Sequence, residues 1–302
     1  MLGTVWLLSL ALCIFVIYFI YRKRQEEENG LFLKLLVYSF IGAFSLGLNG
    51  VKLPLGFFIG LFIVARPNKR NRKSKQYALL FGLLLYIWSL AAPTAGQAWY
   101  EREQTIEVQA DNLYELSFKD MWAAVDAEFH LAGSAKLERF ETDYRSEGLI
   151  DGMRLEFVDQ DNEGFVHYRA ELRGKGSKLH VTRTRIEGPW YQYDRALEMF
   201  WFAERLDSFN LSALKPSGSD YPTYRLETRE GGYVSYGIKD SEKYVVDERG
   251  ITVLEDEQLP VTGYWLNVCG RSALSGQQDH YSCTASADFL FDVVYSKQEQ
   301  AQ

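Results

Sequence analysis

Four apolar stretches within residues 1–95 constrain this chain more than any other feature. A helix that crosses a bilayer needs about 20 mostly apolar residues, and the first and fourth stretches approach that length with their flanks. Asn49, Gly50 and Pro54 interrupt the apolar sequence between the second and third. The alternative for residues 31–65 is a re-entrant hairpin. The sequence predicts an α-helical membrane module of about four transmembrane helices, at residues 4–21, 31–47, 51–66 and 77–94.

Two basic clusters predict how this module is oriented. Arg22–Arg24 follows the first stretch, and Arg66–Lys75 ("RPNKRNRKSK") lies between the third and fourth. With four spans both clusters fall on the same side, which is cytoplasmic because Lys and Arg accumulate in cytoplasmic loops. The sequence therefore predicts a plasma-membrane protein with its N-terminus outside and residues 96–302 extracytoplasmic. The second cluster is also expected to contact anionic lipid headgroups.

The charge of the remaining chain argues against nucleic acid as a partner. Of 33 basic and 40 acidic residues, 22 basic and 37 acidic ones follow Gly96. Phosphate binding needs clustered cations, which this acidic region lacks. The ten-residue basic loop between two predicted spans is also too short to fold around a duplex.

After the membrane module, the residue pattern predicts an α+β region of two similar units, residues 96–190 and 191–302. Apolar residues at helical spacing predict one helix over Ser117–Ala132 and another over Asp194–Phe209. Strand-like segments separated by turn residues follow each helix. Each unit is therefore expected to pack one helix on its own antiparallel sheet.

The segment "YVVDERGITVL" (Tyr244–Leu254) reads as a strand, a tight turn and a second strand. In this position, after a helix and two strands, it resembles the end of a PepSY-type or cystatin-like unit. The resemblance implies a helix packed on an antiparallel sheet. For PepSY-like domains it also implies an extracytoplasmic role in binding proteins or modulating proteases.

An aromatic stretch supplies the candidate binding residues Trp190, Tyr191, Tyr193 and Trp201. These side chains fit the apolar stripe of the second helix less well than Met199 and Phe202 do. Aromatic side chains in excess of the core are typical of interfaces, because they bury a large area with few rotatable bonds. The alternative is a second apolar face that packs on the other unit or on the membrane.

The segment "DQDNEG" resembles the opening of a calcium loop and makes Asp159, Asp161 and Glu163 candidate metal ligands. Ala170 occupies the twelfth position, where a bidentate Glu is expected, and the flanks read as strands. The alternative is a solvated hairpin turn.

Cys269 and Cys283 are the two cysteines after the membrane module. In an oxidising compartment they are expected to form a disulfide. The alternatives are two free thiols, or a zinc site with the nearby His280.

These features predict a multi-pass membrane protein that displays an acidic extracytoplasmic binding or regulatory domain. Its expected partners are the lipid bilayer and another membrane or envelope protein. The sequence contains no Gly-x-Ser-x-Gly, His-Glu-x-x-His or phosphate-binding loop, and we expect no cofactor. The alternatives are a carboxylate-dependent hydrolase of an external polymer and a ligand sensor that signals through partner helices.

Overall fold

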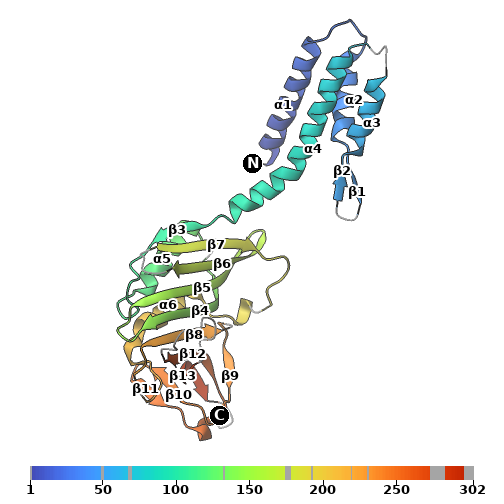
Figure 1. Ribbon diagram of the computed structural model, residues 1–302. Helices are drawn as coiled ribbons and strands as arrows, with labels where there is room; N and C mark the ends of the chain where they lie inside the picture. Colours follow the sequence, from blue (N-terminus) through green and yellow to red (C-terminus); the bar gives the residue numbers. More distant parts are fainter. Residues whose placement is uncertain are drawn as a thin grey trace. The chain divides into compact units, whose positions relative to one another are not determined.

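The computed structural model describes residues 2–48, 51–66, 70–131, 133–173, 178–191, 193–218, 220–229, 231–272 and 283–295. The chain divides into two compact units, Met1–Trp99 and Tyr100–Gln302 (Figure 1). The candidate zinc ligand His280 lies outside the described residues.

The first unit consists of helices and one short β-hairpin. Its elements are α1 (Leu2–Arg22), α2 (Leu31–Ala43), β1 (Leu46–Leu48), β2 (Val51–Leu53), α3 (Leu55–Ala65) and α4 (Arg72–Tyr100). Glycines let three of these helices approach closely. A Cβ on Gly82 of α4 would lie 2.1 Å from the carbonyl oxygen of Ser39 in α2, and one on Gly56 of α3 would lie 2.1 Å from that of Ile41. The helices therefore meet backbone to backbone.

The prediction of about four transmembrane helices is wrong for this unit. Among the described residues, one helix is long and apolar enough to cross a membrane, Arg72–Tyr100. The helices α2 and α3 have 13 and 11 residues. At 1.5 Å per residue they reach about 20 Å and 17 Å, short of the roughly 30 Å of hydrocarbon. The β1–β2 hairpin follows α2 almost directly, so the apolar stretch 31–65 does not form two spanning helices. The prediction of a multi-pass membrane protein is therefore wrong as well.

The second unit contains one large, mostly antiparallel sheet. Its strand order is β11-β10-β13-β12-β8-β4-β5-β6-β7-β3, and β9 pairs with β12. The pair β10–β13 is parallel, whereas the other described pairs are antiparallel. The strands are β3 (Gln104–Glu107), β4 (Lys136–Arg145), β5 (Ile150–Asp161), β6 (Gly164–Arg173), β7 (Lys178–Arg185), β8 (Thr223–Arg229), β9 (Val234–Tyr236), β10 (Lys243–Asp247), β11 (Gly250–Val253), β12 (Val261–Arg271) and β13 (Ala285–Tyr295).

Two helices, α5 (Phe118–Phe129) and α6 (Met199–Ser208), cover one face of this sheet (Figure 1). They form where the apolar stripes predicted them. The side chain of Ser117 caps α5 by accepting a hydrogen bond from the Asp120 backbone N–H. The ring of Phe140 in β4 lies 5.8 Å from that of Phe118 and 5.4 Å from that of Phe202, so both helices share one core. Three short 3-10 helices complete the unit: Tyr193–Arg195, Leu211–Ala213 and Asp256–Gln258.

The prediction of two separate helix-plus-sheet units is also wrong. Strand β4 pairs with β8 along seven residue pairs, from Arg139↔Arg229 to Arg145↔Thr223. This pairing joins the strands that follow α5 to the strands that follow α6. A strand at a sheet edge leaves a row of unpaired N–H and C=O groups, and β4 and β8 satisfy these groups on each other. The result is one continuous sheet with one shared helical layer.

Candidate functional site: the charged face of the sheet

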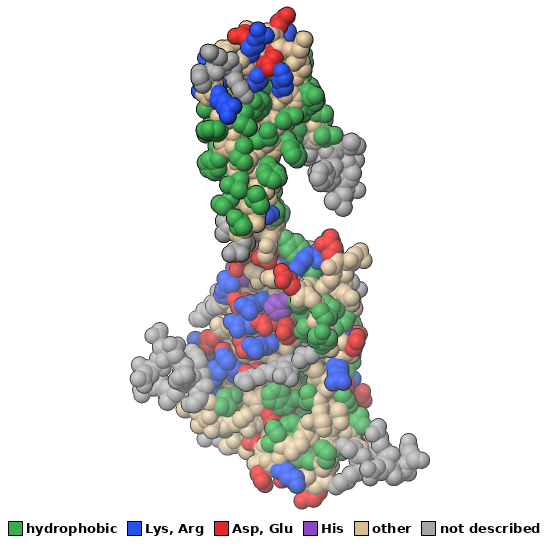
Figure 2. All heavy atoms as spheres, turned by 90° about the vertical axis from the view of Figure 1, so that its right-hand side faces the viewer, with side chains coloured by type: hydrophobic (Ala, Val, Ile, Leu, Met, Phe, Trp, Pro, Cys, Tyr) green, Lys and Arg blue, Asp and Glu red, His purple; other side chains and the backbone are tan. Residues whose placement is uncertain are grey.

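The face of the sheet opposite α5 and α6 is lined with acidic and basic side chains. Side chains alternate between the two faces of a strand. In β5, Met153, Leu155 and Phe157 are buried in the core shared with the helices. The intervening Arg154 and Glu156 therefore point to the opposite face. Figure 2 shows Lys, Arg, Asp and Glu side chains intermixed on one face of this unit.

A chain of ion pairs crosses this face from strand to strand. Arg154 in β5 bridges Glu141 in β4 and Glu171 in β6, with N–O distances of 3.1 Å to each. Arg173 in β6 contacts Glu171 at 2.9 Å and Glu103, which precedes β3, at 3.2 Å. These contacts connect side chains from four different segments. We call the residues Glu103, Glu138, Glu141, Asp143, Arg154, Glu156, His167, Arg169, Glu171, Arg173, His180, Arg225 and Arg271 the charged face.

Asp143 in β4 forms a second group of ion pairs on this face. Its carboxylate accepts hydrogen bonds from Arg225 in β8, at 2.7 Å and 2.6 Å, and from Arg271 in β12, at 2.9 Å. A hollow of about 260 Å³ opens beside these groups, and Gly152 is part of its lining. Because Gly152 carries no side chain, the sheet backbone itself is accessible there between arginines and carboxylates.

Two further contacts on this face involve histidines. His167 Nε2 lies 3.1 Å from the Glu138 carboxylate, and His180 Nδ1 lies 2.7 Å from Glu103. The hydrogen bond from His167 lowers the pKa of Glu138 below its ordinary value, despite the opposing effect of burial. Both histidines therefore lie beside carboxyl groups of the same face.

The arginines around Glu171 hold its carboxyl in the charged form. Burial raises the pKa of Glu171, but hydrogen bonds from Arg173 and Arg154 outweigh it and the net shift is downward. A general acid near neutral pH needs the opposite, a carboxyl whose pKa is raised. The arginines of these pairs are 38% and 58% exposed, whereas Glu171 is 17% exposed, so a partner can contact the arginines directly.

The predicted aromatic site does not come together as one patch. The rings of Trp190 and Tyr193 contact edge to face at 5.9 Å, and Tyr191 beside them is 89% exposed. Trp201 lies instead on α6, where its ring packs against Tyr264 and Phe291 in the core. Three of the four residues therefore share one loop surface, and the fourth serves the packing of α6.

The acidic segment 159–163 forms the turn between β5 and β6. The paired residues Asp161 and Gly164 flank this turn. Arg185 forms ion pairs with Asp161 at 3.0 Å and with Glu163 at 2.8 Å, whereas Asp159 is buried. Within the described residues, no group of three or more His, Cys, Asp or Glu side chains is arranged to hold a metal ion. Residues 159–163 therefore belong to a hairpin turn in which Arg185 balances the negative charge of Asp161 and Glu163.

The predicted disulfide is present. Cys269 in β12 is bonded to Cys283, and their Cα atoms are 5.5 Å apart. The bond joins β12 to the residues just before β13, its antiparallel neighbour. It therefore fixes these two adjacent strands to each other near the end of β12 and the beginning of β13.

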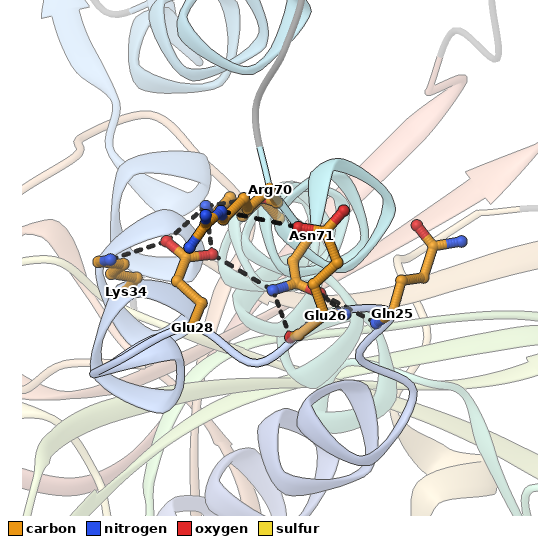
Figure 3. Close-up of polar contacts among 7 residues, drawn as sticks. Gln25, Glu26, Glu28, Lys34, Arg70 and Asn71 are labelled. Carbon is orange, nitrogen blue, oxygen red and sulfur yellow. Dashed lines mark hydrogen bonds and ion pairs between the residues drawn. The ribbon is translucent and has the colours of Figure 1, made fainter.

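A second arrangement of charges lies in the first unit and was not predicted from the sequence (Figure 3). Lys75, part of the basic run, is buried, and its Nζ donates to both carboxylate oxygens of Glu28, at 2.9 Å and 2.8 Å, and to the Arg70 carbonyl at 2.8 Å. Lys34 Nζ donates to the same carboxylate at 2.7 Å. We call Glu28, Lys34, Asn71 and Lys75 the polar cluster.

Asn71 connects this cluster to the loop between α1 and α2. Its Oδ1 accepts from the backbone N–H groups of Gln25 and Glu26, at 2.9 Å and 3.0 Å, and its Nδ2 donates to the Glu26 carbonyl at 2.9 Å. Asn71 adopts a φ of 51°, which asparagine tolerates better than most residues. Burial raises the pKa of Glu28, but bonds from Lys34, Lys75 and Asn71 outweigh it and lower the pKa to about 2.

The fold and these two sites define an α+β protein joined to a helical unit in which, among the described residues, one helix is long and apolar enough to cross a membrane. A family model described as an archaeal family matches residues 119–299, which is more than half of the chain. The chain therefore belongs to that archaeal family. No curated protein and no solved structure matches it.

Proposed function

We propose that this protein is a membrane-anchored binding module whose charged face docks onto another membrane or envelope protein. The observation that carries the proposal is the face itself. Arg169 and Arg173 expose 50% and 58% of their side chains there, and the described helices α5 and α6 pack on the other face of the sheet. Similarity to PepSY-type units, which the Tyr244–Leu254 segment suggests, agrees with a protein-binding role and remains a prediction.

The charge pattern indicates what kind of partner fits. Basic and acidic side chains alternate along and across the strands, so a large surface of one sign would meet as many repulsive as attractive groups. A partner surface with its own alternating charges can replace each internal ion pair with an intermolecular one. Such complementarity favours specificity and the correct register of docking.

We further propose that α4 crosses the membrane with its basic beginning in the cytoplasm and the Tyr100–Gln302 unit outside. Arg70, Arg72 and Lys73 lie at the start of α4, and cations of this kind mark the cytoplasmic side. The disulfide agrees with this orientation, because such bonds persist in oxidising compartments. The predicted outside location of the N-terminus depended on four spans and is not retained.

Site-specific photo-cross-linking in native membranes tests the docking proposal. A photoreactive residue in place of Arg173 probes the charged face, and one in place of the exposed Glu128 on α5 is the matched control. We expect a discrete protein adduct from position 173 and none from position 128. The same adduct from both positions, or no adduct from position 173, would overturn the proposal.

Cysteine labelling in intact cells tests the orientation. Lys73 and Ser217 are both exposed, so Lys73→Cys and Ser217→Cys report on the two sides of α4. An impermeant maleimide is expected to label position 217 and to leave position 73 unlabelled until the cells are opened. The reverse pattern would show that the orientation is wrong.

A further inference from the structure

A pocket of about 730 Å³ lies beside the polar cluster in the first unit. One part of its lining is apolar and comes from Leu33, Val37 and Ile41 of α2 and from Ile63 of α3. The other part is charged and includes Lys34 and Arg70. The pocket is therefore amphipathic, with a hydrocarbon-like wall that meets a polar end.

The polar end carries more positive than negative charge. Three cations, Lys34, Arg70 and Lys75, line the pocket with a single carboxylate, Glu28. Lys75 is only 5% exposed and is held by Glu28 and the Arg70 carbonyl, whereas Lys34 and Arg70 are 48% and 71% exposed. Lys34 and Arg70 pair with Glu28 at 2.7 Å and with Glu26 at 3.8 Å, and both side chains are exposed enough for an incoming anion to contact them, while the buried Lys75–Glu28 pair holds the end of the pocket.

The surface around the pocket indicates where its ligand comes from. Phe40 on α2 and Phe62 on α3 are 75% and 71% exposed, and many other apolar side chains of this unit are exposed as well. Figure 2 shows this apolar surface next to a group of charged side chains at one end of the unit. A contiguous apolar surface of this kind marks contact with another apolar phase, here the lipid hydrocarbon.

We infer that this pocket binds an anionic membrane lipid. The lipid's acidic headgroup pairs with Lys34 and Arg70, and the first part of its hydrocarbon chain lies against Val37, Ile41 and Ile63. Cations near a membrane surface attract anionic lipids, and a basic pocket between helices binds a lipid headgroup at a defined position. This inference concerns the first unit and does not depend on the proposed role of the charged face.

Binding of dioleoylphosphatidylglycerol to the full-length protein, measured by native mass spectrometry with dioleoylphosphatidylcholine as the neutral reference, tests the inference. The double variant Lys34→Gln/Arg70→Gln is expected to weaken retention of the acidic lipid roughly tenfold. Arg72→Gln/Lys73→Gln is the matched control, because it removes two exposed cations that do not line the pocket. The control is expected to change retention less than twofold, or roughly the effect of a screened surface charge.

A second pair of variants tests the apolar wall without changing any charge. Val37→Trp fills the pocket and is expected to reduce retention of the acidic lipid, whereas Phe40→Trp, on the same helix outside the lining, is not. Equal losses in the two charge variants, or full retention in Val37→Trp, would overturn the inference. Complete competition by soluble glycerol 1-phosphate would also overturn it, since the site would then bind phosphate rather than lipid.

Discussion

The polar cluster and the charged face are built from the same residue types, but they differ in burial. In the polar cluster, the Lys75 and Glu28 side chains are 5% and 12% exposed, and they hold the loop between α1 and α2 against the start of α4. On the charged face, Arg169 and Arg173 are 50% and 58% exposed, although their partners Glu156 and Glu171 are 10% and 17% exposed. The two regions therefore differ in the burial of the cation: a buried cation fixes the fold, and an exposed one is available to a partner.

The largest loss of stability is expected when the buried ion pair of the polar cluster is broken. Lys75→Ala leaves the Glu28 carboxylate buried without its main partner, which costs about 3–5 kcal/mol in comparable cases. A denaturant titration of the full-length protein in detergent measures the loss. Lys73→Ala removes an exposed cation two residues away and is expected to stay within about 0.5 kcal/mol. Equal effects of the two variants would show that Lys75 is not a buried partner.

Reduction of the Cys269–Cys283 bond is expected to act on the other unit alone. The bond closes a loop with a sequence separation of 14. A loop of that length corresponds to about 3 kcal/mol of unfolded-state entropy in the simplest model. Hydrogen exchange with and without reductant should show faster exchange in β12 and β13 and unchanged exchange in α2. Faster exchange in both units would mean that their stabilities are coupled.

Acid provides a third test, because Glu28 has a pKa of about 2 in the folded protein and an ordinary value of 4.5. A carboxyl with a lowered pKa contributes stability above its unfolded pKa and loses it as the pH falls through the folded one. Wild-type stability should therefore fall between pH 4.5 and about 2 more than that of Glu28→Gln. Parallel pH curves for the two proteins would contradict this role of Glu28.

The smallest expected effect on stability belongs to the charged face. Arg154→Ala removes two ion pairs whose arginine is 38% exposed, and the expected cost is roughly 1 kcal/mol or less. The same variant should weaken the photo-adduct from position 173 several-fold. A loss of more than about 3 kcal/mol would place Arg154 with the buried pairs and remove the distinction between the two regions.

Local pattern predicted the elements of this protein better than their assembly. The apolar stripes located α5 and α6, although α6 begins at Met199 and not at the predicted Asp194. The joining of β4 to β8 could not be predicted, because Phe140 and Thr228 are brought together by a pairing that no local periodicity encodes. The two predicted units therefore became one sheet.

The sequence could predict only part of the charged face and none of the burial in the polar cluster. Alternation in "HYRAELR" (His167–Arg173) indicates which side chains share a face, so the charged face had a readable signal. Its specific ion pairs depended on strand order, which the sequence left open. The burial of Lys75 had no local signal, since it depends on Asn71 holding the Gln25–Glu28 loop against the start of α4.

The most direct test of docking through the charged face measures binding and stability in one charge-neutralised variant. Arg169 is half exposed and pairs at 2.8 Å with Glu156, which is 10% exposed. In Arg169→Gln, which keeps a hydrogen-bond donor beside Glu156, docking through this face predicts that the photo-adduct from position 173 falls roughly tenfold, as loss of about 1.4 kcal/mol of binding requires. It also predicts that the unfolding free energy of the full-length protein changes by about 1 kcal/mol or less. An unchanged adduct in a variant of unchanged stability would contradict the account.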